Sequence, residues 1–457
     1  MRLLLISPNK EQFPPAYPLG LNYLASYIRG LGHDVSVLDL LKLDDEVNEI
    51  KTAINNEKPD IVGISIRNID NCLSNVPKLY YNQYKLFIDV VKNITSVPII
   101  LGGAGFSILP EQLLNYYDLK FGIVGEGEEA LSQFIDRLQR KESFDGIPGL
   151  VQRINGEYKI NPHKNTFRLD SDKSFFPLRE KNNINMYKPD GRLWMNIQSR
   201  RGCSEACIYC VYPYLEGCRM RFRDVKSIGD ELEYLDKELN VGLVSFVDGV
   251  FNNPVDFAVE ICEEILHRNL SFEWNAALSV DPNFLSVPLL KLMKRSGCRV
   301  ADFSGTDTAS EIMLRKMRKN YNKADIVEGS RRCREAGLKV IHSLLLGGPG
   351  ETADTIKESF ELMEKINPDT LWANVGIRIY PNTEIYNIAC SENYLIGEHS
   401  LLNPVYYLAP TLSETNFREI VSSYRERHSS WALTCLAENY SEWVTEIIKY
   451  ADSLQNN

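Results

Sequence analysis

Residues 200–210 have the sequence RRGCSEACIYC and bring Cys203, Cys207 and Cys210 into one short loop. With spacings of four and three residues, such a loop can place three thiolates at three corners of a single [4Fe–4S] cube. Ferredoxin-type electron carriers close the fourth corner with another cysteine. A fourth iron left open can instead bind the amino and carboxylate groups of S-adenosylmethionine (SAM) and pass it one electron. The loop therefore predicts an iron–sulfur site with these three cysteines as ligands.

A zinc site is the main alternative for this loop. Cys218 lies eight residues after Cys210 and would complete a set of four cysteines for structural zinc. The other cysteines show no ligand spacing, and we expect them to pack as small apolar side chains. They are Cys72, Cys262, Cys298, Cys333, Cys390 and Cys435.

The composition is that of an ordinary globular protein. The 457 residues are enough for about two or three domains, and the net charge of -10 argues against nucleic acid as the main partner. No apolar run reaches the roughly 18 residues that span a bilayer, and no signal peptide precedes the first apolar run. We therefore expect no membrane partner and a cytoplasmic location, where a reducing environment suits an oxygen-sensitive cluster.

The first third of the chain alternates between short apolar runs and amphipathic segments. The apolar runs predict strands at 3–7, 35–39, 61–66, 98–101 and 121–124. The amphipathic segments predict helices at 19–31, 44–56, 80–91 and 129–140. Strands that alternate with helices form a parallel, doubly wound sheet. We therefore expect an α/β domain of the flavodoxin-like type at residues 1–140.

Glycine-rich segments follow two of these strands, at 102–105 and 125–128. In doubly wound sheets, ligands bind beyond the carboxyl ends of the strands, and glycine there lets the backbone approach a large flat ligand closely. Phosphate is a weaker candidate, because there is no Walker-type loop and no G-x-G-x-x-G motif at the first helix. The alternative is a domain that serves only as scaffold or binds a nucleotide.

The cysteine loop, with Tyr209 just before its last cysteine, resembles the signature of the radical SAM enzymes. The first third resembles the cobalamin-binding domain of the cobalamin-dependent members of that family. The features that carry this second resemblance are Pro14 and Gly20 of a proline-rich turn, the Gly102-Gly103 pair with Gly105, and Gly125-Glu126-Gly127. The resemblance covers roughly residues 1–390. It implies three cofactors, namely a [4Fe–4S] cluster, SAM and cobalamin.

A second alternating series begins at Leu193. Its predicted strands lie at 193–198, 243–248, 272–278, 299–305, 339–346 and 371–380, with helices between them such as 254–268, 309–317 and 325–336. Six such units fit the partial (βα)6 barrel of radical SAM enzymes, at residues 191–390. The cysteine loop then follows the first barrel strand, at the face where barrels place their active sites.

The resemblance also implies a SAM site at the strand ends of this barrel. Ser304, Gly305 and Asp307 lie where the family often has Gly-x-Glu-Ser, so Asp307 is expected near the ribose or amino group of SAM. Gly347-Gly348 matches the motif that lies along SAM, and Tyr380 ends the strand that packs near adenine.

Asp248 and Arg67 are the two candidate catalytic residues. Asp248 ends the second barrel strand and is expected to face substrate or SAM, with a solvated strand-end aspartate as the alternative. Arg67 and Asn68 follow the third strand of the first domain, at the edge expected to face the corrin. A surface arginine in a loop is the alternative for Arg67.

A specific role for Arg67 follows from a missing histidine. Many cobalamin proteins carry Asp-x-His-x-x-Gly, whose histidine binds cobalt from below, and this chain lacks that motif. His33 follows the first helix and is expected to be a turn residue. Residues 65–71 resemble the loop of the tryptophan 2-C-methyltransferases, which place an arginine beneath cobalt. The resemblance implies that Arg67 fills the lower face without binding the metal, because a guanidinium has no lone pair to offer.

The remaining segments are a connector at 141–190 and a C-terminal region at 391–457. The connector begins with a predicted β-hairpin at 149–160, turning at Asn155-Gly156, and continues as a polar linker. The C-terminal region is expected to be helical at 419–427 and 442–454, with most of its aromatic side chains in core packing.

The resemblance implies a methyltransferase. In that chemistry cobalamin takes a methyl group from one SAM and gives it to a carbon or phosphorus atom of a small molecule; an unactivated carbon also needs a radical from a second SAM. An external electron donor such as flavodoxin or ferredoxin is then required. The alternatives are rearrangement or cyclisation without methyl transfer, a radical SAM enzyme without cobalamin, and a non-catalytic iron–sulfur or cobalamin sensor.

Overall fold

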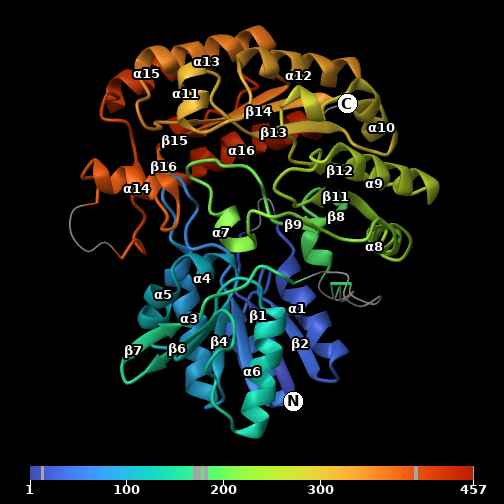
Figure 1. Ribbon diagram of the computed structural model, residues 1–457, viewed down its shortest axis with the longest axis vertical. Helices are drawn as coiled ribbons and strands as arrows, with labels where there is room; N and C mark the ends of the chain where they lie inside the picture. The colour runs from blue at the N-terminus through green and yellow to red at the C-terminus, as the bar shows by residue number, and fades with distance from the viewer. Residues whose placement is uncertain (12–14, 168–175, 178, 180–183, 396–399, 456–457) are drawn as a thin grey trace.

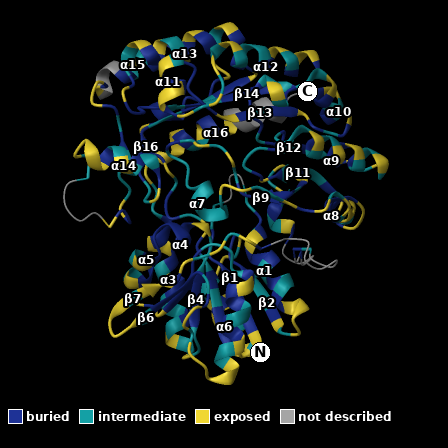
Figure 2. Cartoon of the chain, viewed as in Figure 1, coloured by how far each residue is buried: buried dark blue, intermediate teal, exposed yellow. Residues whose placement is uncertain are grey.

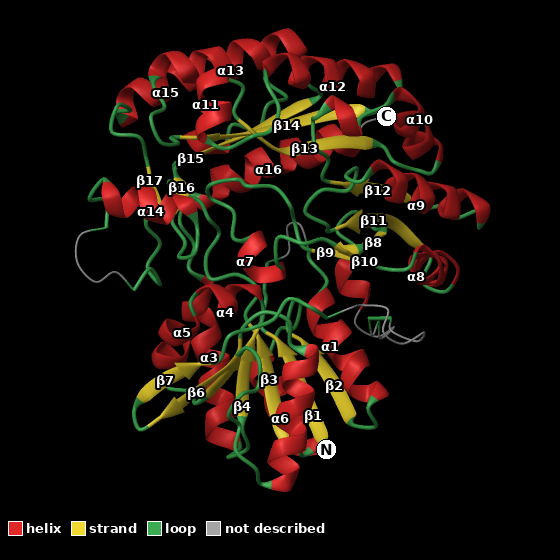
Figure 3. Cartoon of the chain, viewed as in Figure 1, coloured by secondary structure: helices red, strands yellow, loops and turns green. Residues whose placement is uncertain are grey.

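The computed structural model describes residues 1–11, 15–167, 176–177, 179, 184–395 and 400–455. Figure 1 shows an N-terminal sheet domain below and a barrel domain above, with the short helix α7 (Tyr212–Glu216) between them. In Figure 3 the parallel strands of the N-terminal sheet, which are the first five in sequence, run toward the barrel domain. The carboxyl ends of these strands therefore face the segment that holds the cysteines.

The N-terminal domain is a seven-stranded sheet in the order β2-β1-β3-β4-β5-β6-β7. Its elements are β1 (Arg2–Ser7), α1 (Leu19–Gly30), β2 (Asp34–Asp39), α2 (Glu46–Glu57), β3 (Ile61–Ser65), α3 (Tyr80–Ile94), β4 (Ile99–Gly102), α4 (Ala104–Ile108), α5 (Pro110–Tyr117), β5 (Phe121–Ile123), α6 (Glu128–Arg140), β6 (Leu150–Ile154) and β7 (Glu157–Ile160). The first five strands are parallel, as predicted.

The predicted hairpin is part of this sheet and not of a separate connector. β6 pairs antiparallel with β5, and β7 pairs antiparallel with β6. The parallel strands are covered on both faces, as the continuous burial of Leu3, Leu4, Leu5 and Ile6 in β1 illustrates. Figure 2 shows the same pattern, with buried strands and exposed residues on the outer helices.

The barrel domain contains six parallel strands in two sets, β8-β11-β12 and β13-β14-β15. Its elements up to the sixth strand are η1 (Ile184–Tyr187), β8 (Leu193–Ile197), β9 (Arg200–Arg201), α7, β10 (Arg221–Phe222), α8 (Val225–Lys237), β11 (Val241–Phe246), α9 (Val255–His267), β12 (Glu273–Ala276), η2 (Pro282–Phe284), α10 (Val287–Arg295), β13 (Val300–Asp307), α11 (Glu311–Lys316), α12 (Lys323–Glu335), β14 (Lys339–Leu346), α13 (Ala353–Ile366) and β15 (Thr370–Val375). Two isolated bridges, Trp274–Cys298 and Ala277–Asp302, join the sets into one open barrel.

The predicted sixth strand is interrupted. β15 ends at Val375. Gly376 follows with a φ of +78°, a backbone conformation that residues with a side chain rarely adopt. The chain continues as β16 (Ile377–Arg378), which pairs with β17 (Tyr406–Tyr407). The remaining elements are α14 (Glu384–Ser391), α15 (Glu414–Arg425), η3 (Thr434–Leu436) and α16 (Tyr440–Gln455). No helix in the described ranges is long and apolar enough to cross a membrane.

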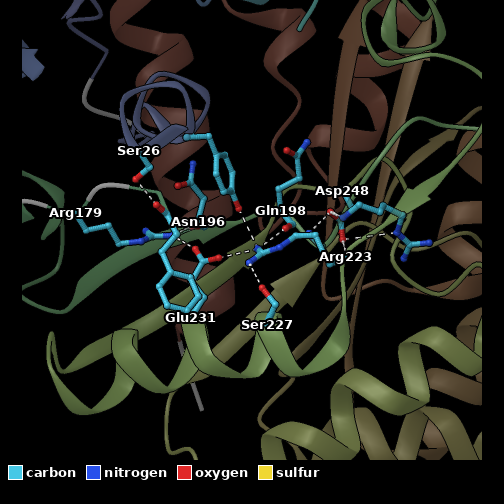
Figure 4. Close-up of polar contacts among 12 residues, drawn as sticks. Ser26, Arg179, Asn196, Gln198, Arg223, Ser227, Glu231 and Asp248 are labelled. Atoms are coloured by element: carbon cyan, nitrogen blue, oxygen red, sulfur yellow. Dashed lines mark hydrogen bonds and ion pairs between the residues drawn. The ribbon is translucent and has the colours of Figure 1, made fainter. Parts of the chain in front are cut away.

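A buried polar network fixes the start of the barrel against the N-terminal domain. Glu231 of α8 accepts from Arg179 at 2.5 Å and from Arg223 at 2.7 Å, and all three side chains are at most 1% exposed. Arg223 also donates to the Gln198 carbonyl at 2.9 Å and to the hydroxyl of Tyr23 in α1 at 3.0 Å. Figure 4 shows this row of side chains beside the end of β8. The network therefore sets the position of the chain just before the cysteine loop.

Candidate functional site

A cavity lies between the carboxyl ends of the N-terminal strands and the beginning of the barrel domain. One wall is formed by α1 and the segments after β1, β3, β4 and β5, and the other by Gln198, Arg201 and α7. The predicted cofactor-binding residues that line it are Gly20, Arg67, Gly102, Gly103, Gly125, Glu126 and Gly127. The structure thus brings residues from four strand ends to one place.

The glycines around this cavity differ in what an added side chain would meet. A Cβ on Gly20 would meet no atom within 4 Å, so a side chain there would occupy open space at the cavity wall. Gly103 has a φ of +95°, and a Cβ there would lie 2.6 Å from the Ile66 carbonyl oxygen. Gly105 lies outside the lining, and its Cβ would be 3.0 Å from the Arg67 carbonyl oxygen. Bare backbone along the wall fits a flat macrocycle such as the corrin of cobalamin.

Arg67 follows β3, and its side chain lines the cavity. Solvent in the cavity reaches the side chain, yet the surrounding protein lowers the pKa of the guanidinium through desolvation. Among the residues that the structure describes, it has no hydrogen-bond or ion-pair partner. Tyr84, Tyr80 and Tyr187 lie close enough to influence its charge. Arg67 is therefore a cavity residue and not an arginine of the outer surface.

The carboxylate of Glu126, at the cavity wall, joins the two domains. Its Oε1 lies 2.7 Å from Arg221 Nη1 and 3.3 Å from Arg201 Nη1, and its Oε2 accepts from the Phe167 N–H at 3.1 Å. Glu128 lies 2.6 Å from Arg201 Nη2. The carboxylate is thus already paired with two arginines, and a contact of Glu126 with a cofactor stays a prediction.

The cysteine loop runs from β9 to α7 and is held by its backbone. Cys203 N–H donates to the Gly217 carbonyl at 3.1 Å, and Tyr212 N–H donates to Cys210 Sγ at 3.4 Å. Burial raises the pKa of the Cys210 thiol to about 11 and also raises those of Cys203 and Cys207. A bound metal centre would lower these pKa values instead, because it binds cysteine in the thiolate form. Three partly buried thiols in one loop fit a cluster with three protein ligands.

Cys218 differs from the three loop cysteines in its exposure. Its side chain is exposed, whereas Cys203, Cys207 and Cys210 are partly buried. Across the described ranges, no three His, Cys, Asp or Glu side chains converge in a way that could hold a single metal ion. A cubane cluster takes its ligands at separate corners, so its thiolates stand further apart than the ligands of one zinc ion.

The predicted SAM residues of the fourth barrel strand lie against this loop. Tyr209 donates from its hydroxyl to Asp307 Oδ2 at 2.5 Å, and Asp307 has a φ of +61°. Lys319 forms an ion pair with Asp307 and donates to the Gly305 carbonyl at 2.9 Å. A Cβ on Gly305 would meet nothing within 4 Å, and the Ser304 carbonyl accepts from Ser343. A carboxylate, a phenol and an ammonium group therefore meet beside Cys207.

The N–H groups of Gly347 and Gly348 are already engaged. Both donate to Glu351 Oε2, the latter at 3.1 Å, and burial raises the pKa of Glu351 to about 7. A Cβ on Gly348 would lie 3.0 Å from Met313 Cε. The two glycines thus shape a tight turn, and their position along SAM stays a prediction.

The prediction that Asp248 faces substrate, SAM or solvent is wrong. Its side chain is 0% exposed, and Oδ1 accepts from the N–H groups of Ser199 at 2.8 Å and Arg200 at 3.2 Å. The Ser199 hydroxyl donates to Oδ2. The carboxylate therefore holds the segment just before the cysteine loop, as the right side of Figure 4 shows.

Other predicted residues lie at the edge of the site or away from it. The Tyr380 hydroxyl is 3.2 Å from Cys72 Sγ, across the boundary between the domains, so its contact with adenine stays a prediction. Asn68 does not line the cavity. His33 contacts the terminal ammonium of Met1 at 3.3 Å, as befits a turn residue. Pro14 lies outside the described residues.

Both parts of the chain match known protein families. The family model described as "Radical SAM superfamily" matches residues 197–363, and the model described as "B12 binding domain" matches residues 14–135. An uncharacterized methyltransferase of Pyrococcus horikoshii is 26% identical over 91% of this chain and 89% of its own length. Tryptophan 2-C-methyltransferase of Streptomyces laurentii is 22% identical over 82% of this chain and 72% of its own length.

Two further comparisons bear on chemistry and fold. The anaerobic magnesium-protoporphyrin IX monomethyl ester cyclase of Rubrivivax gelatinosus is 25% identical over 82% of this chain and 67% of its own length. The structure of the radical SAM methyltransferase TsrM from Kitasatospora setae, with tryptophan and a SAM analogue bound, aligns with a TM-score of 0.84 at 22% identity. That alignment covers 98% of this chain and 96% of the other, so the fold is shared over its whole length.

Proposed function

We propose that this chain, which joins a B12-binding domain to a radical SAM domain, is a methyltransferase that moves a methyl group from SAM to a small molecule. The observation that carries the proposal is the shared cavity, where glycine-rich strand ends of one domain face α7 of the other. Bound cobalamin supplies a metal centre that takes up a methyl group and passes it on. The methyltransferases among the relatives support the same activity.

The N-terminal wall would hold the flat face of the corrin. Gly20, Gly102 and Gly125 offer backbone without side chains along the cavity. Arg67 would lie at the lower face, where its donors and its lack of a lone pair leave the metal without a protein ligand. Its positive charge would also disfavour added positive charge on the metal.

The barrel side would hold the cluster and SAM. Cys203, Cys207 and Cys210 would bind the cluster, which supplies an electron obtained from a donor such as flavodoxin or ferredoxin. Asp307 and Tyr209 would lie near the polar end of SAM, because the pair that they form with each other and with Lys319 stands beside Cys207. Asp248 would keep this loop in place from beneath.

A product screen with methyl-labelled SAM tests the proposal. The protein, loaded anaerobically with all three cofactors and supplied with a reductant, is incubated with fractionated small molecules from the source cells. A methyltransferase gives a labelled product together with S-adenosylhomocysteine. An unlabelled rearranged or cyclised product with 5′-deoxyadenosine would favour the cyclase-type activity, which the cyclase relative makes the main competitor.

A further inference from the structure

Lys319 lies between α11 and α12, and its ammonium group is buried against the cysteine loop. Nζ is 3.2 Å from Cys207 Sγ, which is 112 residues away in sequence. Nζ also pairs with the Asp307 carboxylate, and the two side chains are only 3% and 5% exposed. The ring centroid of Tyr209 lies 5.4 Å from Nζ.

A lysine is an unusual choice for this position. Lysine is almost never fully buried unless it is paired, because taking its charge out of water is costly. Asp307 offsets that cost, yet a neutral side chain would fill the same space without any charge to offset. The distinctive feature of Lys319 is its N–H group directed at the sulfur of a predicted cluster ligand.

We propose that Lys319 raises the reduction potential of the [4Fe–4S] cluster, an inference that rests on the cluster assignment in the proposed function. Hydrogen bonds to ligand sulfurs and nearby charges are among the factors that set cluster potentials. Reduction adds one negative charge to the cluster, and an ammonium group beside a ligand sulfur stabilises that charge. Asp307 acts in the opposite sense, because its carboxylate destabilises the reduced cluster.

Redox titration of the reconstituted full-length chain, followed by electron paramagnetic resonance without SAM, tests the inference. At the midpoint potential of the native cluster, Lys319→Met is expected to raise the ratio of oxidised to reduced cluster at least tenfold. For a one-electron couple, this corresponds to a shift of the midpoint by about 59 mV toward negative potential. Asp307→Asn is expected to shift the midpoint in the positive direction. Lys319→Arg keeps the charge and is expected to stay near the native value.

Lys323→Met is the matched control, because Lys323 pairs with Glu358 on the outside of the barrel. This variant is expected to leave the midpoint potential of the cluster unchanged. An unshifted midpoint in Lys319→Met, or shifts of the same sign in Lys319→Met and Asp307→Asn, would overturn the inference. If Lys319→Met takes up no iron, Asp307→Asn decides, and a midpoint that does not rise counts against it. Failure of the native chain to bind about four irons would instead refute the cluster assignment.

Discussion

Arg201 Nη2 lies 2.6 Å from Glu128 Oε1, and this buried pair joins the loop that holds the cysteines to the N-terminal domain. Arg201 stands two residues before Cys203, and Glu128 begins α6. Glu126, on the same strand end, binds Arg201 and Arg221. The strand end that faces the cavity and the loop predicted to bind the cluster are therefore held in one fixed arrangement.

Arg201→Met is expected to destabilise the protein by about 3–5 kcal/mol, because it leaves the buried carboxylate of Glu128 without its partner. The free energy of unfolding in urea measures this loss. Lys159→Met removes the ion pair with Asp145, whose two side chains are 53% and 61% exposed, and should leave the free energy of unfolding nearly unchanged. Equal losses of unfolding free energy in the two variants would show that the buried pair of Arg201 and Glu128 contributes no more than the exposed pair.

Gly20→Leu is expected to block cobalamin binding, because its side chain would enter the open space at the cavity wall. Gly30→Leu is a matched control at the other end of α1, since a Cβ there also meets nothing within 4 Å and Gly30 does not line the cavity. Equilibrium dialysis should show binding by Gly30→Leu and by the native chain only. Native affinity in Gly20→Leu would place cobalamin elsewhere.

The position of Arg67 predicts a cobalt without a protein ligand below. Electron paramagnetic resonance of the cob(II)alamin state bound to the native chain should show no nitrogen superhyperfine splitting, because a guanidinium has no lone pair to offer. Three-line splitting from a protein imidazole would contradict this assignment. Arg67→His offers a positive control, since it supplies a possible nitrogen ligand at the same place.

His342 of β14 predicts a pH dependence of stability. Its Nδ1 is 2.8 Å from Thr306 Oγ1 and its Nε2 is 2.9 Å from Ser330 Oγ, and burial lowers its pKa from 6.5 to about 3. The unfolded chain therefore gains a proton below pH 6.5 that the folded chain does not bind. The stability due to neutral His342 is present above that pH and falls as the pH drops toward 3.

Between pH 6.5 and pH 5 this loss is up to about 2 kcal/mol. Urea unfolding at several pH values measures it, and His342→Gln should reduce the slope over this range even if it is less stable throughout. His267→Gln, at an exposed site, should keep the native slope. A native slope in His342→Gln would mean that other groups cause the pH dependence.

Much of the fold could be predicted from the sequence because its parallel strands are buried on both faces. Apolar runs such as 61–66 and 339–346 lie where β3 and β14 are found. The hairpin was also predicted, but its pairing with β5 was not, because strand pairing depends on the edge that the sheet leaves free. The short helices α4 and α5 have only five and eight residues and gave too little periodicity.

The site could be predicted only where chemistry is local in sequence. The cysteine spacing and the glycine pairs are such features. Asp248 looked like a strand-end carboxylate, and only the fold reveals that the N–H groups of Ser199 and Arg200 enclose it. Lys319 belongs to no motif and reaches Cys207 through the packing of distant barrel strands. Side chains that act through tertiary contacts leave no pattern in a single sequence.

The central claim is that this chain moves the methyl group of SAM by way of cobalamin, and a single-turnover labelling measurement tests it without knowledge of the acceptor. The native chain, loaded with reduced cobalamin, is mixed anaerobically with SAM that carries a labelled methyl group, and the cobalamin is then extracted for mass spectrometry. The account predicts labelled methyl on the extracted cobalamin and an equal amount of S-adenosylhomocysteine. Unlabelled cobalamin, with SAM either intact or cleaved to 5′-deoxyadenosine, would contradict it.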